Sequence, residues 1–188
     1  MIKDLRIRRA ESSDAEVLET LAKDQQITEE SLAKSPGELS DDGFVTWGQS
    51  SETYVERCQL SEHFLVAERS NRIVAWVMAY SLGVLSELQD GMSYEDKIVS
   101  FFLKRYPLHA VFIDQICVIP SMKRTGVATT LDQRLRELTP EGVFVTDIIH
   151  GPIRNEASIQ YFKGIGFTEV TEVPQNEWLL GIYERYII

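Results

Sequence analysis

The residues in this chain best suited to chemistry form a short basic turn, Lys123-Arg-Thr-Gly-Val-Ala128. An apolar, strand-like run at 110–119 precedes the turn and is stopped by Pro120, and an amphipathic helix pattern follows it. The start of a helix presents backbone N–H groups without partners in the helix, together with the positive end of the helix dipole. The group that such a turn binds most readily is a phosphate.

The elements that must position this turn are the strand before it and the helix after it. Val127, Leu131, Leu135 and Leu138 are spaced to share one face of a helix, and Pro140 ends that helix. The turn matches neither the Walker loop nor the dinucleotide-binding pattern, because both need glycines where this chain has other residues. The expected phosphate ligand is therefore of a different kind.

Read as Lys123-x-x-Gly126-x-Ala128, the turn resembles the Gln/Arg-x-x-Gly-x-Gly/Ala loop of the GNAT superfamily of N-acetyltransferases, which binds the pyrophosphate of coenzyme A. Lys at the first position departs from the usual Gln or Arg. It supplies a positive charge but lacks the planar guanidinium group of Arg. The segment Asn155–Phe167 resembles a second GNAT signature, Asn-x-x-Ala-x-x-x-Tyr-x-x-x-Gly-Phe, with Ser158 at the Ala position. The resemblance covers nearly the whole chain.

The resemblance implies that acetyl-coenzyme A is the cofactor. In the family, a bulge splays the central strand from the next one, so that backbone N–H groups bind the pantetheine arm and polarise the thioester carbonyl; here these belong to Ile116 and Val118. The alternative for Ile116 and Val118 is that they lie in an ordinary strand whose N–H groups all pair in the sheet. The alternative for Asn155 is that it only caps the helix and does not contact the cofactor. The cofactor-binding residues expected on this basis are Ile116, Val118, Lys123, Arg124, Thr125, Gly126, Val127, Ala128, Thr129, Asn155 and Phe162.

One departure concerns the Tyr that usually donates a proton to the leaving coenzyme A thiolate, because Phe162 stands at its position. Tyr161 is adjacent, but neighbouring residues on a helix point about 100° apart, so we interpret it as a packed aromatic residue. The thiolate then takes its proton from water or another hydroxyl, Tyr183 being a remote candidate. Otherwise the site binds the cofactor without efficient transfer.

The general base is the second catalytic group to identify. Strand alternation predicts one shared face for Phe112, Asp114, Ile116 and Val118, and Asp114 is the carboxylate among them. We expect Asp114 to be the base. The alternative, given equal weight, is that Asp114 only binds solvent or an Arg. His150, just past the next strand, is an alternative base or acceptor contact, or else a loop cap. No metal ligands are assigned.

The predicted function is transfer of an acetyl group from acetyl-coenzyme A to a primary amine of a small molecule or peptide, by direct attack in a ternary complex. A weak or inactive acyl-coenzyme A sensor is the alternative, and a cofactor-free interaction domain is a third. The resemblance implies that residues 25–60 shape the acceptor site. Acids there, Asp41, Asp42 and Glu52, beside Trp47, suit a cationic acceptor, although a solvated loop also explains them.

The predicted fold is mixed α/β (α+β), one GNAT-like domain over 1–188 with a mostly antiparallel sheet of about seven strands flanked by helices. Its order is β-α-α-β-β-(inserted helix)-β-α-β-α-β-β, with a helical insertion at about 84–108 that serves as a lid or dimer contact. Ser13-x-x-Glu16 predicts a capping box at the first helix, and Ser93-x-x-Asp96 predicts the start of the inserted helix, which runs to Arg105.

Composition bounds the remaining possibilities. With a net charge of −10 and a pI near 4.8, the chain is not expected to bind nucleic acid. Cys58 and Cys117 provide no disulfide framework, which fits a reducing compartment. The N-terminus is charged where a signal peptide would be apolar, and the uncharged run 73–86 is too short to cross a membrane. We expect a cytoplasmic monomer or homodimer that does not bind membranes.

Overall fold

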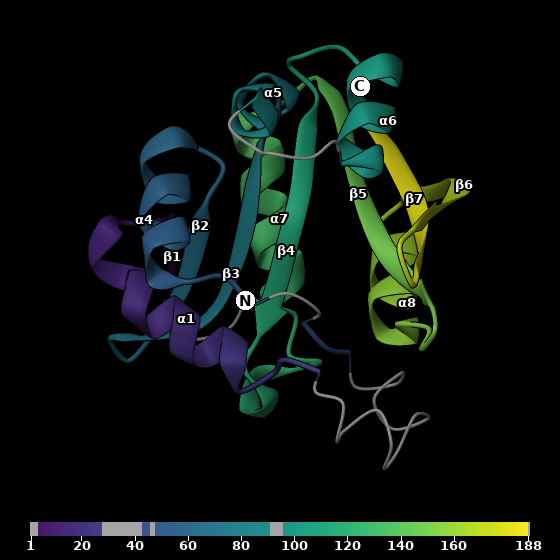
Figure 1. Cartoon of the computed structure of the whole chain (residues 1–188). Helices are drawn as coiled ribbons and strands as arrows, with labels where there is room; N and C mark the ends of the chain where they lie inside the picture. The colour runs from purple at the N-terminus through teal and green to yellow at the C-terminus, as the bar shows by residue number, and fades with distance from the viewer. Residues whose placement is uncertain (1–3, 28–42, 46–47, 91–95, 188) are drawn as a thin grey trace.

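The computed structural model describes residues 4–27, 43–45, 48–90 and 96–187 (Figure 1). Within them, the elements follow the predicted order. The strands are β1 (Leu5–Arg9), β2 (Leu65–Arg69), β3 (Arg72–Ser81), β4 (Val111–Val118), β5 (Gly142–Gly151), β6 (Thr168–Gln175) and β7 (Trp178–Ile187). The helices are α1 (Ala15–Lys23), α4 (Ser51–Leu60), α5 (Leu82–Asp90), α6 (Lys97–Arg105), α7 (Val127–Leu138) and α8 (Glu156–Gly164).

The seven strands form one sheet in the order β1-β2-β3-β4-β5-β7-β6. The β4–β5 pair is parallel and the other neighbouring pairs are antiparallel, so the predicted mixed, mostly antiparallel sheet is confirmed. Ser70 and Asn71 both have positive φ at the tight turn between β2 and β3, as the predicted hairpin requires. The strand β3 is buried over most of its length, which is why its sequence is apolar on both faces.

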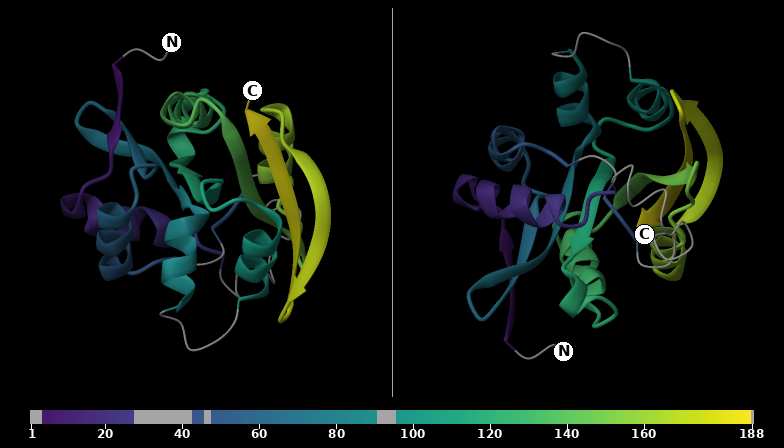
Figure 2. Two further views of the ribbon diagram at one scale, coloured as in Figure 1. Left: turned by 90° about the horizontal axis from the view of Figure 1, so that it is seen from above. Right: turned by 60° about the horizontal axis from the view of Figure 1, so that its bottom comes forward.

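Helices cover both faces of the sheet (Figures 1 and 2). On one face, α1, α4, α5 and α6 pack in a core that contains Leu18, Trp76 and Phe102. On the other face, α7 and α8 pack in a core that contains Leu131 and Phe144. The three-layer arrangement therefore places the turn before α7 and the start of α8 on the same side of the sheet.

The insertion between β3 and β4 differs from the prediction of one helix, because α5 and α6 both lie in it. The sequence reasoning missed α5. The helix α6 begins after Asp96, whose carboxylate accepts the N–H groups of Ile98 (2.8 Å) and Val99 (3.2 Å). Asp96 is thus a confirmed helix-start residue, whereas its predicted partner Ser93 lies outside the described residues.

Two other local predictions were wrong. The first helical segment does not begin with a Ser13 capping box. Its carboxylate cap is Asp14, which accepts the N–H of Glu11 at 2.8 Å and pairs with Arg8 at 2.7 Å. In α7, Leu138 is 37% exposed, whereas Val127, Leu131 and Leu135 are buried, so Leu138 does not share their buried face. No helix in the described ranges is long and apolar enough to cross a membrane.

A buried ion pair fastens α7 to β7. Arg185 Nη2 lies 2.6 Å from Asp132 Oδ1, and the two side chains are only 8% and 3% exposed. Arg185 also donates to the carbonyl of Ile165 at 2.9 Å, and its guanidinium lies over the rings of Phe144 and Phe167. This arrangement locks the helix that follows the basic turn to the C-terminal half of the sheet.

We expect Asp132→Asn to lower the free energy of unfolding by about 3–5 kcal/mol, because the buried guanidinium loses its counter-charge. Glu137→Gln, which removes an exposed ion pair with Arg134, is the matched control and should cost less than about 0.5 kcal/mol. Urea unfolding of both variants measures the difference. Equal effects in the two variants would contradict the anchoring role.

Candidate active site

The strand β4 carries one residue more than its neighbour β3 at Asp114. Gln115 is opposite Met78 and Ile113 is opposite Ala79, so Asp114 has no register partner. A bulge of this kind shifts the phase of side-chain alternation beyond it. The residues after the bulge therefore change face relative to those before it.

The predicted shared face of Phe112, Asp114, Ile116 and Val118 is therefore wrong. Phe112 packs in the core beneath α6, whereas Ile116 and Val118 pack in the core beneath α7. Asp114 stays on the side of Phe112, because its carboxylate accepts a hydrogen bond from Tyr80 of β3. The acid and the two residues expected to hold the cofactor thus lie on opposite faces of one strand.

Beyond the bulge, β4 separates from β5. The two strands pair only at Val111–Phe144 and Phe112–Val145, and Figure 1 shows them diverging toward the start of α8. The hydroxyl of Thr146 spans the start of this opening by donating to the Ile113 carbonyl at 2.8 Å. The bulge and the splay that the family resemblance implies are both confirmed.

Backbone N–H groups of β4 face this opening. The N–H of Ile119 donates to the Val74 carbonyl of β3 at 2.9 Å. Because antiparallel ladder bonds alternate along a strand, the N–H groups of Val118 and Ile116 point away from β3, toward the side where β5 has separated. They are positioned as a pair of donors along the edge of the opening.

A cavity of about 570 Å³ extends from the opening to the basic turn. Of the predicted cofactor residues, all but Thr125, Asn155 and Phe162 line it. The hydroxyl of Thr125 instead donates to the Met122 carbonyl at 2.6 Å. The lining residues among those predicted are Ile116, Val118, Lys123, Arg124, Gly126, Val127, Ala128 and Thr129.

The turn has the backbone form of an anion-binding nest. Arg124 and Gly126 have φ angles of 61° and 92°, and Gly accepts the latter without steric cost. The first N–H bonded back into the helix is that of Thr130, which donates to the Gly126 carbonyl at 3.0 Å. The preceding N–H groups of the first turn of α7 thus have no acceptor within the helix and face the ligand side.

A smaller cavity of about 110 Å³ lies within the splay itself. Its lining includes Asp114 on one side and Phe162 and Asn155 of the α8 segment on the other. The two cavities meet, because Ile116 and Ser158 line both of them, together with Phe44 and Val45. The two cavities are therefore neighbours at the opening in the sheet.

Two acidic residues, Asp114 of β4 and Asp147 of β5, line the smaller cavity. Burial raises the pKa of Asp114, although the hydrogen bond from Tyr80 and the cation of Arg57 oppose the rise. Burial also raises the pKa of Asp147 to about 7, with the charge of Asp114 contributing to the increase. Within the described ranges, no side chain donates a hydrogen bond to the Asp147 carboxylate, whose charge is therefore available to a ligand.

The sequence reasoning missed Asp147, and also Gln115. Asp147 is the one acid in the apolar run Val143–Ile149, which was the available signal. Gln115 lines the smaller cavity, and its carbonyl oxygen accepts hydrogen bonds from Tyr54 (2.9 Å) and Trp76 (2.8 Å). These two bonds hold the bulged strand in place beside Asp114.

The start of α8 is organised as predicted. Asn155 caps the helix by accepting the N–H of Ser158 at 3.2 Å, and its amide donates to the Phe44 carbonyl at 3.3 Å. Tyr161 is a packed residue whose hydroxyl donates to the Ala128 carbonyl at 2.9 Å, which joins α8 to α7. Phe162 is 3% exposed and packs edge-on against Phe167.

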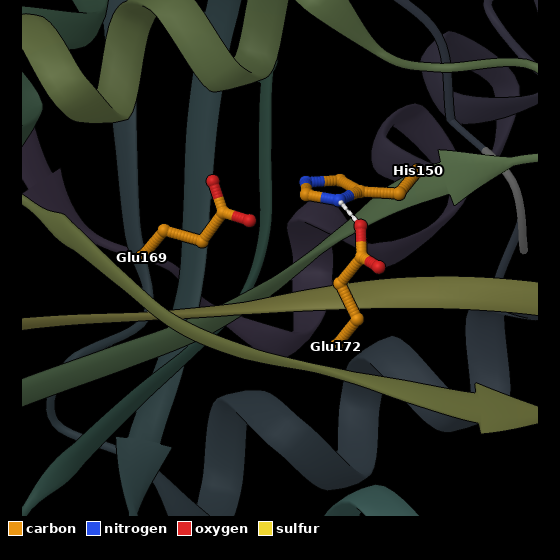
Figure 3. A group of neighbouring side chains, drawn as sticks. All are labelled: His150, Glu169 and Glu172. Carbon is orange, nitrogen blue, oxygen red and sulfur yellow. Dashed lines mark hydrogen bonds and ion pairs between the residues drawn. The ribbon is translucent and has the colours of Figure 1, made fainter.

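His150 lies away from both cavities, which differs from its expected place at the acceptor. Its ring lies directly over Gly181 of β7, where a Cβ would come within 2.2 Å of Nε2. His150 Nδ1 is 2.7 Å from Glu172 (Figure 3). His150 Nε2 is 2.9 Å from the hydroxyl of Tyr183. Tyr183, the remote candidate proton donor, is fully buried in this network and likewise lines neither cavity.

His150, Glu169 and Glu172 bring potential metal-ligand atoms within 4.8 Å of one another (Figure 3). Each of these groups already has a partner, because Tyr183 donates to Glu169 at 3.1 Å and Lys163 lies 3.2 Å from the same carboxylate. The cluster is a continuous hydrogen-bonded chain that joins β5 to the edge strand β6 across β7.

Part of the expected acceptor region can be compared with the structure. Phe44, Val45 and Gln49 line the smaller cavity, so the segment 25–60 does contribute to it. Glu52 is exposed in the first turn of α4. The other residues named for this region, Asp41, Asp42 and Trp47, lie outside the described residues.

Comparison with known proteins agrees with this geometry. Residues 34–167 match the model of the acetyltransferase (GNAT) family. No curated protein matches the chain. Solved structures with the same fold include Ard1 from Thermoplasma volcanium, at TM-score 0.65 and 14% identity, with 98% of this chain and 99% of that chain covered.

Two further structures extend the comparison. Arabidopsis thaliana Naa50 in complex with the bisubstrate analogue CoA-Ac-MVNAL has a TM-score of 0.61 and 9% identity, with 97% and 98% of the chains covered. The polyamine N-acetyltransferase of Drosophila melanogaster has a TM-score of 0.60 and 15% identity, with 97% and 100% covered.

The family match spans most of the chain and contains the splayed strand, the basic turn and α8. The chain therefore belongs to the acetyltransferase (GNAT) family, and it is an N-acetyltransferase.

Proposed function

We propose that the protein transfers the acetyl group of acetyl-coenzyme A to a primary amine of a small molecule or peptide, by direct attack in a ternary complex. The observation that carries this proposal is the junction of two cavities beside the splayed strand, at Ile116 and Ser158. The larger cavity has the length and the anion-binding turn for coenzyme A. The smaller cavity has the acids for an amine.

In this arrangement the pyrophosphate is held by the N–H groups of the 124–129 turn and by the charge of Lys123. The pantetheine arm follows the edge of β4 toward the junction. The N–H groups of Ile116 and Val118 then bind the arm and polarise the thioester carbonyl. Fixed backbone donors of this type stabilise the oxyanion that develops when the amine attacks.

The acid pair would recruit and activate the amine. An alkylamine arrives mostly protonated at neutral pH, so the carboxylates of Asp114 and Asp147 attract it. Transfer needs the neutral amine, and a base with a pKa close to 7 accepts a proton efficiently at neutral pH. We therefore assign the base role to Asp147 and retain Asp114 as the charge that raises its pKa. The amide product is uncharged and loses this attraction.

The acceptor class is consistent with two related enzymes, one of which is named for polyamines and one of which binds a peptide-based bisubstrate analogue. We further propose that residues 1–188 act as one acetyltransferase domain, with residues 84–108 as its helical insertion, in the cytoplasm and as a monomer or homodimer. Neither nucleic acid nor membrane is a proposed partner. The net charge of −10 supports a cationic small molecule or peptide.

The second candidate function is an acyl-coenzyme A sensor with weak or no transfer, and Phe162 favours it because Phe has no proton to donate. Both candidates predict thermal stabilisation by coenzyme A. Only the enzyme releases free thiol from acetyl-coenzyme A in proportion to an added amine.

We expect the purified protein to release thiol when acetyl-coenzyme A is mixed with a panel of diamines, polyamines, monoamines and peptides with free N-termini. Diamines should react faster than monoamines of equal length, because the acid pair attracts the added positive charge. Thiol release is followed with a chromogenic disulfide reagent, and acetylated product by mass spectrometry. Stabilisation by acetyl-coenzyme A without amine-dependent thiol release would favour the sensor instead.

The two acids can be separated by their pH dependence. Asp147→Asn should lower kcat by about 100-fold or more, because the base is removed. Asp114→Asn should lower kcat only several-fold and move the acidic limb of the kcat/KM profile to lower pH, because loss of its negative charge lowers the pKa of Asp147. If Asp114→Asn is the more damaging variant, with no shift of that limb, Asp114 is the base. Coenzyme A affinity should change little in either case.

Stability provides a test of Asp147 that does not depend on activity. A carboxyl whose pKa is raised in the folded state destabilises that state when it is ionised, so Asp147→Asn should be more stable than the wild type at pH 8. The difference should shrink as the pH falls from about 7 toward about 4, because folded wild type takes up the proton while the unfolded chain does not. Exposed Glu16→Gln is the control, with no such trend. If the wild type has the larger free energy of unfolding at pH 8, the proposal that Asp147 has a raised pKa is contradicted.

A further inference from the structure

A thioester that loses its acyl group leaves a thiolate, and the junction of the two cavities is where the proposed function puts that sulfur. A developing negative charge in a partly dry cavity needs a hydrogen-bond donor close to it. The aromatic side chain nearest this point on α8, Phe162, has no donor. A protein donor at this point would therefore come from another residue that lines the junction.

Most hydroxyl groups around the cavities already donate hydrogen bonds to other protein groups. Tyr161 donates to the Ala128 carbonyl, and Thr146 donates to the Ile113 carbonyl. Tyr80 bonds to Asp114 and lines neither cavity. Thr129 lines only the larger cavity, at the turn that would hold the pyrophosphate.

Ser158 differs from these groups in two ways. It lines both cavities, whereas the other hydroxyl residues in their linings border only one of them. Its backbone N–H is bonded to the Asn155 cap, but its hydroxyl has no hydrogen-bond partner among the described residues. Among the described residues, Ser158 is therefore the hydroxyl donor available at the junction.

The position of Ser158 on α8 supports the same role. Residues four apart on a helix lie on one face, so Ser158 is one turn before Phe162 and presents its side chain to the same side. Both residues line the smaller cavity, which confirms their common direction. Ser158 also lies in the first turn of α8, where the helix dipole favours a thiolate over a neutral thiol.

We propose that the hydroxyl of Ser158 donates a hydrogen bond to the coenzyme A sulfur as the carbon–sulfur bond breaks, in place of the aromatic hydroxyl that Phe162 lacks. The inference rests on the proposed function. The ammonium first gives one proton to Asp147, which passes it to solvent. The neutral amine nitrogen then forms the new bond to the carbonyl carbon and gives its second proton to Asp147. The electron pair of the broken bond goes to sulfur, which leaves as a thiolate and is protonated by solvent after release. Ser158 keeps its own proton, because an alkoxide is a stronger base than a thiolate.

Steady-state kinetics of Ser158→Ala test this inference. Loss of one hydrogen bond to a charged group should lower kcat by about 10- to 100-fold. The KM and Kd for acetyl-coenzyme A should stay within about twofold of the wild type, because the bond forms only as the sulfur becomes charged. Ser158→Thr, which keeps a hydroxyl, should retain most of the activity. Ser13→Ala, an exposed hydroxyl at the first helix, is the control.

A second variant separates this role from a structural one. Adding Phe162→Tyr to Ser158→Ala restores a hydroxyl one turn away on the same helix face, and we expect kcat to recover at least several-fold. The inference would be overturned by any of three results. These are an unchanged kcat in Ser158→Ala, an effect of Ser158→Ala that is confined to KM and Kd, and no recovery of kcat in a correctly folded double variant. An inactive wild type would overturn the proposed function and the inference together. An active wild type matched by Ser158→Ala would overturn the inference alone.

Discussion

The extra residue in β4 at Asp114 is the constraint on which the site depends. It interrupts the register with β3, turns Asp114 toward the α1–α4 face, and is followed by the separation of β4 from β5. A regular strand would have satisfied its N–H groups in a ladder and closed the space where both cavities now lie. The bulge thus supplies the donors, the opening and the acid at one position. It is held by Gln115, whose side chain is fixed by Tyr54 and Trp76.

The opening has an electrostatic consequence. It leaves two carboxylates, Asp114 and Asp147, lining one cavity, where burial raises the pKa of both and the charge of Asp114 adds to the rise at Asp147. Tyr80 and Arg57 lower the pKa of Asp114, whereas at Asp147 a backbone hydrogen bond is the contribution that opposes the rise. A folded protein tolerates such a group only because the rest of the sheet, including the Asp132–Arg185 anchor, is strongly packed. In the proposed function, an amine bound there would offset this negative charge, so the destabilised site and its proposed affinity for a cation would have the same cause.

Sequence patterns predicted the features that depend on neighbouring residues in the chain. The order of strands and helices, the Ser70–Asn71 turn, the Asn155 cap and the basic turn before α7 are all local, and the structure confirms them. The face of Ile116 could not be obtained from alternation, because one bulged residue reverses the phase of every side chain after it. The importance of Asp147 depends on β5 lying beside the bulge, and that is a tertiary relationship. His150 was misplaced for the same reason, since its direction is set by the space over Gly181.

The net charge of the chain is unevenly distributed, so that the two cavities have electrostatic fields of opposite sign. Coenzyme A carries several negative phosphate charges, and the overall charge of −10 should repel it. In the proposed function, the turn at 123–129 overcomes this repulsion with Lys123, Arg124 and the start of α7, which line the larger cavity. The acids lie at the other end, beyond Ile116. Because screening limits each field to about 10 Å, cofactor and amine each encounter mainly the charges at their own end. In the proposed function, the sheet opening would keep these two charged regions apart while the two reacting atoms meet between them.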